Sequence, residues 1–380
     1  GQDPTEVLCD LASGATLELT LVEAPSQPTP DRGGLEGTWR FQLDPDGVGE
    51  AERWFARDLD DSIDLPGTTD LAGKGYPLDP DTMTYPVPFE HLRFPGLPPA
   101  ERADERGFLV RERYWVGPAW YQRTIEVPQA WAGRPLRLTL ERVLWASDVW
   151  VDDLHVGRLD SLAAPHEHDL GVLEPGAHRL TLRVDNSEIH PIGTIGHAYG
   201  PETQSRWNGV VGRIELAAER PCHIRRLEVH PAADRRSVRV LAHVRNDTPR
   251  PGTALFQLEV GEEGAPALAR VEQRVDLEPG PGVVELSVPI DREVRGWDEH
   301  DPTLHVLSAS MDFEGGLSKA RTTFGFRHIE RDGRTIRING RPALLRGTLD
   351  CAVYPRTGHP PTTVDEWLDV LGTIQGYGFN

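Results

Sequence analysis

Residues 324–350 read FGFRHIERDGRTIRINGRPALLRGTLD, and the character of the chain changes across this stretch. A β-branched run at residues 335–338 is followed by Asn339 and Gly340, and an apolar run resumes at residues 343–345. An Asn-Gly pair between two such runs is the strongest short signal for a hairpin, because both central residues of a type I′ turn take positive φ. The stretch therefore predicts a β-hairpin that separates a β-rich region from a region of alternating strand and helix.

Length and composition favour several β domains joined by many turns. At roughly 150 residues per domain, 380 residues suggest two or three domains. The turn residues are frequent, 38 Gly and 33 Pro, and they separate short runs of Val, Ile, Leu and Trp. The net charge is −20, and binding to a phosphate backbone needs clustered Lys and Arg, so nucleic acid is a poor partner. No stretch reaches the roughly 18 to 20 apolar residues of a membrane span, so no membrane partner is predicted.

Cysteines and histidines give no metal site. Cys9, Cys222 and Cys351 are widely separated, so neither a disulfide framework nor a C-x-x-C metal clamp is encoded. His166 and His168 could place two imidazoles on one face of a strand, but spacing supplies no third ligand, and an ordinary surface strand is favoured. No P-loop or dinucleotide fingerprint occurs, so no cofactor is expected. The first residues lack the features of a signal peptide, although a chain that begins with Gly allows prior removal, and the compartment stays open.

The pattern of residues divides the chain into four parts. Residues 1–33 show no sustained period, which predicts a flexible lead-in. Residues 34–220 carry alternating strands that suggest a jelly-roll sandwich. Residues 221–327 hold seven short runs, which fit an immunoglobulin-like sandwich without its cysteine pair. Residues 328–380 begin an α/β element. The seven runs are residues 224–229, 238–244, 254–260, 271–277, 283–288, 304–311 and 321–326.

A capped helix is predicted after the hairpin. Thr363 and Glu366 form a capping box, and Gly376 and Gly378 supply the end. Asn380 stands where a next strand begins. One strand and one helix cannot bury their own apolar faces, so we expect the N-terminal portion of a longer protein with a barrel of about 250 residues. The apolar stripe of the helix consists of Val364, Trp367, Leu368, Leu371 and Ile374.

A spaced series of motifs resembles family 2 of the glycoside hydrolases, from about residue 35 to the last residue. The matching segments are GPAWY at 117–121, WNG at 207–209, GRI at 212–214, W-x-x-x-x-P-x-L at 297–304, FGFR at 324–327, ING at 338–340 and LRG at 345–347. The resemblance implies a mainly β chain with a jelly roll, an immunoglobulin-like sandwich and the first strand and helix of a (β/α)₈ barrel. It also implies retaining hydrolysis by two glutamates on later barrel strands, so no catalytic residue is expected before the end of this chain.

The resemblance also suggests substrate-binding positions. In the family, the loop that ends at Trp207 and Asn208 reaches the mouth of the barrel, and many members have a sugar-binding Asp where this chain has Thr203. Asp350 lies just past the first barrel strand and Asn380 begins the next, at the face on which barrel active sites are built. Packing of a loop or strand end is an equal alternative for Thr203 and Asp350.

A second departure from the family pattern lies at residues 348–351. Galactosidase-like and glucuronidase-like members usually have Asn, a basic residue and His there, and this chain has TLDC. The usual galactoside and glucuronide specificities are therefore not implied.

Two functions stay open from the sequence. The first is the N-terminal part of a retaining, exo-acting glycosidase that cleaves O-glycosidic bonds of a β-linked sugar, inactive as this portion alone. The second is a stand-alone carbohydrate-binding or adhesion module, which explains the β domains but not the helix and strand after the hairpin. Both predict a carbohydrate partner, and homo-oligomerisation stays open.

Overall fold

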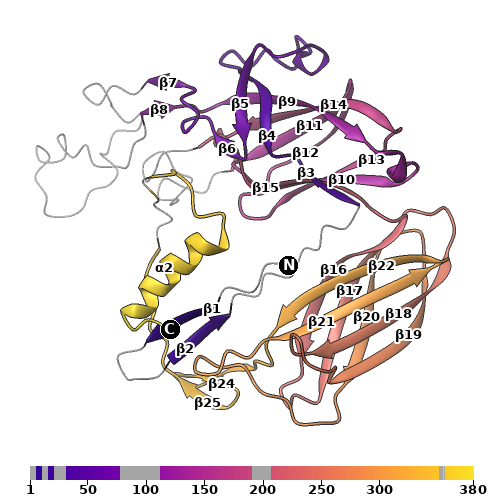
Figure 1. Ribbon diagram of the computed structural model, residues 1–380, viewed down its shortest axis with the longest axis vertical. Coiled ribbons are helices and arrows are strands. Elements are labelled where there is room, and N and C mark those ends of the chain that lie inside the picture. The colour runs from indigo at the N-terminus through magenta and orange to yellow at the C-terminus, as the bar shows by residue number, and fades with distance from the viewer. Residues whose placement is uncertain are drawn as a thin grey trace, which may run out of the picture. The chain divides into compact units, whose positions relative to one another are not determined.

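The structure is a computed structural model of the chain, and it describes residues 6–10, 16–20, 31–77, 112–190, 207–350, 354 and 356–380. In these parts antiparallel sheets dominate (Figure 1). Chain contacts divide the molecule into two units. The first unit comprises Pro30–Ala218 and Leu349–Glu366, and the second comprises Gly1–Thr29, Glu219–Thr348 and Trp367–Asn380.

Two sheets of the first unit enclose one apolar core. The strands are β3 (Arg32–Gly34), β4 (Gly37–Leu43), β5 (Asp61–Leu65), β6 (Gly67–Thr68), β9 (Pro118–Val127), β10 (Pro135–Val143), β11 (Ala146–Val151), β12 (Leu154–Leu159), β13 (His166–Val172), β14 (Gly176–Asp185) and β15 (Gly209–Ala218). One sheet has the order β12-β11-β14-β9-β4-β5, and the other has β13-β10-β15-β3 with β6 paired to β15. Trp39 and Phe41 alternate with exposed residues on β4 and are buried, because successive side chains of a strand point to opposite faces.

Short elements complete the first unit. They are the 3₁₀ turns η1 (Trp54–Ala56) and η3 (Gln129–Trp131) and the paired strands β7 (Tyr76–Pro77) and β8 (Arg113–Tyr114). Trp54 and Phe55 of η1 pack with Trp120 and Trp150 in a small aromatic cluster, and the rings of Phe55 and Trp150 stack at 5.5 Å. This cluster contacts β9 and β11 through Trp120 and Trp150.

The second unit contains a seven-stranded sandwich. Its strands are β16 (Cys222–Pro231), β17 (Ser237–Asn246), β18 (Gly252–Gly261), β19 (Ala269–Leu277), β20 (Gly280–Pro289), β21 (His305–Phe313) and β22 (Gly316–Phe324). They form sheets of order β16-β17-β20 and β19-β18-β21-β22, and both sheets contribute to one core. Each of the seven predicted runs overlaps one of these strands, because every run keeps the alternation of a half-buried strand.

The predicted hairpin is confirmed. Strands β23 (Ile329–Asp332), β24 (Thr335–Ile338) and β25 (Arg341–Ala343) form a three-stranded sheet, and Ile338 pairs with Arg341 across a two-residue loop. Asn339 has φ 49° and Gly340 has φ 78°. These are the positive values that a type I′ turn requires.

The predicted helix and its cap are also confirmed. Helix α2 (Val364–Gly376) begins where the Thr363 Oγ1 accepts the Glu366 N–H at 3.3 Å and the Glu366 carboxylate accepts the Thr363 N–H at 3.2 Å. Within the described residues no helix is long and apolar enough to cross a membrane. The apolar stripe is only partly covered: Leu368 is buried, whereas Leu371 is 39% exposed.

Strand structure is incomplete on either side of α2. Asn380 donates its N–H to the Arg346 carbonyl at 3.0 Å, so the segments before and after the helix lie side by side. Residues 344–347, however, do not form the regular strand that the sequence predicts. A single paired residue leaves most of their backbone groups without the ladder that defines a strand.

The start of the chain also differs from the prediction. The sequence predicts no regular element in residues 1–33, but β1 (Glu6–Asp10) pairs with β2 (Thr16–Thr20), and β3 begins at Arg32. The alternation of Leu17 and Leu19 with polar residues is only five residues long, which is too short to count as a sustained period.

A strand is present at His166 and His168, as the sequence predicts, but the predicted surface placement of the two histidines is wrong. Both side chains are buried, with 0% and 3% exposure, because β13 alternates and its even-numbered residues face the core. The Ser147 Oγ lies 2.7 Å from His166 Nδ1 and 2.8 Å from His168 Nε2. Across the described parts of the chain, no group of three or more His, Cys, Asp or Glu is arranged to hold a metal ion.

Candidate functional site

Asn208 lies at the base of the predicted loop and is completely buried. Its Oδ1 accepts the Tyr121 hydroxyl at 2.7 Å. Its Nδ2 donates to the carbonyls of Gly117 at 3.0 Å and Val184 at 3.2 Å, and contacts Asn186 Oδ1 at 3.3 Å. An amide with its donors and acceptor engaged in this way holds strand ends together. Asn208 therefore has a structural role next to Trp207. Contact between Asn208 and a ligand would require these hydrogen bonds to break.

Burial keeps the partner of Asn208 protonated. The hydroxyl of Tyr121 has a pKa well above its usual value because it is buried and because the charge of Asp70 lies nearby. A neutral phenol can donate to the amide oxygen throughout the physiological pH range. Deprotonation of Tyr121 therefore does not break its hydrogen bond to Asn208 at physiological pH.

Trp207 is positioned by the same network. Asn186 accepts the Gly117 N–H at 2.9 Å and donates to the carbonyls of Trp115 at 2.9 Å and Trp207 at 3.1 Å. The half-buried Trp207 ring meets the His359 ring edge-on, with centroids 6.2 Å apart and an interplanar angle of 68°. Thr203 lies outside the described residues.

Asp350 is exposed and has a partner that the sequence analysis missed. The Tyr354 hydroxyl donates to Asp350 Oδ2 at 2.8 Å. Burial and the hydrogen bond to Asp350 raise the pKa of Tyr354 to about 12, while Arg142 acts in the opposite direction. Tyr354 is thus a neutral donor that orients the carboxylate. Only four positions separate the acid and the hydroxyl in the sequence, and this short spacing was the signal that could have suggested the pair.

One turn connects the Asp350–Tyr354 pair with the Trp207–His359 pair. The Tyr354 carbonyl accepts the Gly358 N–H at 2.7 Å, and the Thr357 hydroxyl donates to the His359 carbonyl at 2.7 Å. His359 Nδ1 lies 2.8 Å from the Pro360 carbonyl, which can only accept, so Nδ1 carries a proton. The turn therefore places Tyr354, which holds Asp350, and His359, which contacts Trp207, close together in the chain.

Asn380 is engaged with its neighbours in the second unit. Its Nδ2 donates to the Leu344 carbonyl at 3.0 Å, and its Oδ1 accepts the Arg346 N–H at 2.7 Å. The side chain thus extends the backbone pairing between the two segments. A ligand at Asn380 would compete with these bonds.

The comparison with known families covers the strands of the first unit. Residues 33–190 match the family described as "Glycosyl hydrolases family 2, sugar binding domain". This stretch is a family 2 sugar-binding domain. It contains Asn186, while Trp207 and Asn208 follow it in the same unit.

The chain is a distant relative of longer family 2 enzymes. It is 25% identical over 347 residues to "Beta-galactosidase 2" of Enterobacter cloacae, covering 86% of this chain and 30% of that protein. It is 24% identical over 366 residues to "Beta-galactosidase large subunit" of Latilactobacillus sakei, covering 92% and 55%. The chain thus spans about a third to a half of these relatives.

Solved structures of the same family share the fold. Bacteroides uniformis beta-glucuronidase 2 matches with a TM-score of 0.64 and 16% identity, over 90% of this chain and 38% of that one. A family 2 member from Bacteroides cellulosilyticus matches with a TM-score of 0.62 and 17% identity, over 83% and 38%. At this identity the likeness shows the fold alone.

Proposed function

We propose that this chain is the substrate-positioning, non-catalytic part of a retaining, exo-acting family 2 glycosidase. Residues 34–220 act as the jelly-roll domain, residues 221–327 as the immunoglobulin-like domain, and residues 328–380 as the start of a (β/α)₈ barrel. The family 2 sugar-binding domain at residues 33–190 and the β-galactosidase relatives support this assignment.

The observation that carries the proposal is the pairing of Asn380 with Arg346 across helix α2. The Asn380 N–H donates to the Arg346 carbonyl. The chain segment before helix α2 and the segment after it therefore lie side by side. Side-by-side segments joined through a helix are the repeating unit of a parallel sheet. A carbohydrate-binding module made of two sandwiches has no need of such a unit.

In this proposal the chemistry belongs to two glutamates of the longer protein. Their carboxyl groups stand about 5 to 5.5 Å apart in retaining glycosidases, so that one attacks the anomeric carbon while the other protonates the leaving oxygen. In this proposal Asp350 accepts hydrogen bonds from sugar hydroxyls in addition to the one from Tyr354, because a carboxylate has about four acceptor sites. In this proposal the exposed part of the half-buried Trp207 side chain stacks on the apolar face of a sugar ring.

The test uses the longer protein and a panel of aryl β-glycosides. We expect hydrolysis of at least one substrate, with NMR of the first-formed sugar showing a retained anomer. An inverted first product would refute the double displacement. The 380-residue chain, assayed in parallel, should hydrolyse none of the substrates, and turnover that survives removal of contaminants would refute the non-catalytic role.

A stand-alone carbohydrate-binding module is the second candidate, and the sugar-binding domain favours it. Isothermal titration of the 380-residue chain with monosaccharides and oligosaccharides separates the two functions. Tight sugar binding by this chain, together with no glycosidase activity in the longer protein, would select the module.

A further inference from the structure

Strand β19 forms a long exposed edge in the second unit. It pairs with β18, and no other strand in the described parts of the chain pairs with it. Strand β20 is the edge of the facing sheet. A free edge presents a row of backbone donors and acceptors, and natural proteins usually protect such an edge against pairing with another chain.

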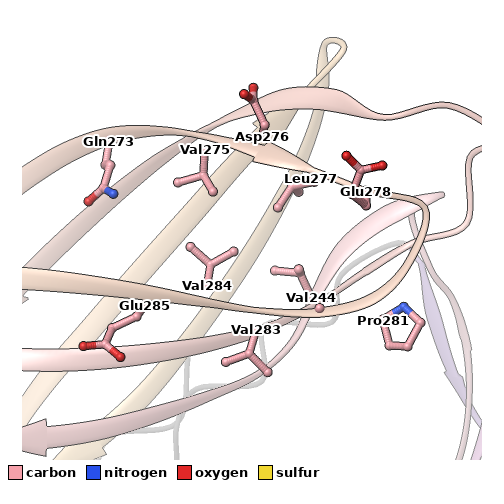
Figure 2. Close-up of a pocket in the computed structure, with 11 residues that line it drawn as sticks. Val244, Gln273, Val275, Asp276, Leu277, Glu278, Pro281, Val283, Val284 and Glu285 are labelled. Carbon is pink, nitrogen blue, oxygen red and sulfur yellow. The ribbon is translucent and has the colours of Figure 1, made fainter.

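A cavity of about 270 Å³ opens between the two edges, and apolar and polar side chains both line it, among them Val275, Gln273 and Glu285. Figure 2 shows Val275 and Leu277 pointing from β19 toward Val284 and Val244, while the Asp276 side chain points in the direction opposite to that of Val275. The volume lies below the roughly 300 to 1,000 Å³ of ordinary small-molecule sites. We therefore assign no small-molecule ligand to this cavity, and the free edge of β19 is the feature available to a partner.

The sequence of β19, ARVEQRVDL, is complementary to itself in the antiparallel direction. When two copies pair about a two-fold axis at Gln273, Arg270 of one copy faces Asp276 of the other, and Glu272 faces Arg274. Val271 faces Val275 in the same register. Every charged position of one strand thus meets an opposite charge of the other, and opposite charges directly across a strand pair stabilise the pairing.

The faces of β19 agree with this register. Its even-numbered residues, which include all of its charges, are exposed, while Val271 and Val275 are partly buried against the core and Leu277 is buried. The register pairs odd-numbered residues with odd-numbered ones and even-numbered with even-numbered. The backbone N–H and C=O groups that point away from β18 in one copy therefore face the corresponding groups of the other copy. Charges then meet charges on the outer face, and valines meet valines beside the cavity.

Existing contacts of the charged side chains are compatible with the pairing. Arg270 Nε lies 2.9 Å from Glu259 Oε2. Gln257 donates to Glu272 Oε1 at 2.7 Å, and Thr253 donates to Asp276 Oδ1 at 2.6 Å. A carboxylate accepts about four hydrogen bonds, so each acid can keep its contact on β18 and accept an Arg of the second copy.

We propose that β19 is a homodimerisation edge, at which two copies of the chain pair antiparallel about Gln273 and join two four-stranded sheets into one. The interface is isologous, because the same strand is used by both copies. A single strand pair with a small apolar patch belongs at the low end of interface sizes. We therefore expect a dissociation constant of roughly 1 to 100 µM.

Charge reversal gives a sharp test, because two defective variants should repair each other. Arg274→Glu places two carboxylates opposite each other, one at position 272 and one at position 274, twice per dimer. Glu272→Arg places two arginines opposite each other at the same positions. A mixed dimer contains one copy of each variant. The introduced Glu at position 274 of one copy then faces the introduced Arg at position 272 of the other, and the original Glu272 faces the original Arg274. Both pairs are attractive again. Sedimentation equilibrium of the 380-residue chain from about 1 to 200 µM in about 0.15 M salt measures all combinations.

We expect the parent chain to dimerise and each single variant to bind itself about tenfold more weakly or worse, since opposite cross-strand charges attract and like charges repel. The equimolar mixture should return to within about threefold of the parent. Lys319→Glu, an equal change of charge on the exposed face of β22, is the matched control and should behave as the parent. Far-ultraviolet circular dichroism confirms folding of each variant.

Three results would overturn the proposal. One is a parent chain that stays monomeric to about 200 µM. The second is equal weakening by Arg274→Glu and Lys319→Glu, which would indicate a general effect of net charge. The third is a mixture that associates no better than the single variants.

Discussion

The buried pair His166 and His168 should make the stability of the first unit depend on pH. His166 Nε2 lies 2.9 Å from the Ser161 carbonyl, which only accepts, so Nε2 carries the proton and Nδ1 accepts the Ser147 hydroxyl. That hydroxyl in turn accepts the His168 Nε2–H. The chain of bonds is complete with both rings neutral. A proton added to His166 Nδ1 would break the bond that Nδ1 accepts, and the Ser147 hydroxyl hydrogen would have to rotate away from it.

The size of the effect follows from the pKa of His168. Burial, followed by the neighbouring His166 and His155, lowers this pKa from 6.5 to about 4. At about 1.36 kcal/mol per pH unit, the difference between these values corresponds to about 3 kcal/mol. Between pH 6.5 and about 4 the unfolded chain binds a proton that the folded chain excludes. The free energy of unfolding is therefore highest above pH 6.5 and falls as the pH drops toward about 4.

Urea unfolding followed by tryptophan fluorescence between about pH 4 and 8 measures this change, because most tryptophans lie in the first unit. The matched variant is His168→Gln, whose amide can still donate to Ser147 but does not titrate. The variant should lose about 3 kcal/mol of the difference in unfolding free energy between about pH 4 and pH 6.5. Parallel pH curves for parent and variant would refute the reasoning.

Three further outcomes are expected. Asn208→Ala should lower the free energy of unfolding by about 3 to 5 kcal/mol, since it leaves several buried groups unpaired, and a denaturant midpoint within error of the parent would contradict this. Thr363→Ala should cost about 1 kcal/mol and speed hydrogen exchange in the first turn of α2, whereas Thr373→Ala, inside the helix, should not. In the longer protein, Asp350→Ala should lower kcat/KM by about 10 to 150-fold, from one charge-assisted bond of roughly 1.5 to 3 kcal/mol, and Tyr354→Phe should lower it less. A fall in Tm with kcat/KM within a few-fold of the parent would make Asp350 structural.

Short sequence patterns were sufficient to predict the strands and the helix start that depend on residues close together in the chain. The seven strands of the second unit's sandwich follow from alternation, and the start of α2 follows from Thr363 and Glu366, which lie one turn apart. Asn208 could not be understood in this way. Its partners Gly117, Tyr121, Val184 and Asn186 come from other strands and loops, so a residue proposed for substrate contact is occupied by the fold.

Burial of polar residues was the second point that the sequence could not settle. A histidine on an alternating strand reads as exposed unless its partner is known. Ser147 lies on β11 in the other sheet of the first unit, 19 and 21 positions away from His166 and His168 in the sequence. Only the folded chain brings the hydroxyl between the two imidazoles, and this contact compensates for their removal from water.

Asn339 shows which part of a residue's role the Asn-Gly turn signal can predict and which part depends on the fold. The turn needs positive φ, and Asn, Asp or Gly would satisfy it. The side chain does more than the turn requires: Oδ1 accepts the His328 N–H at 2.9 Å, while Nδ2 donates to the carbonyls of Trp297 at 2.9 Å and Phe326 at 3.0 Å. Gly would lose all three bonds, and Asp would replace two donations by repulsion between its oxygen and two carbonyls. The turn explains why one of a few residues stands at position 339, and the contacts with two other segments of the second unit explain why that residue is Asn.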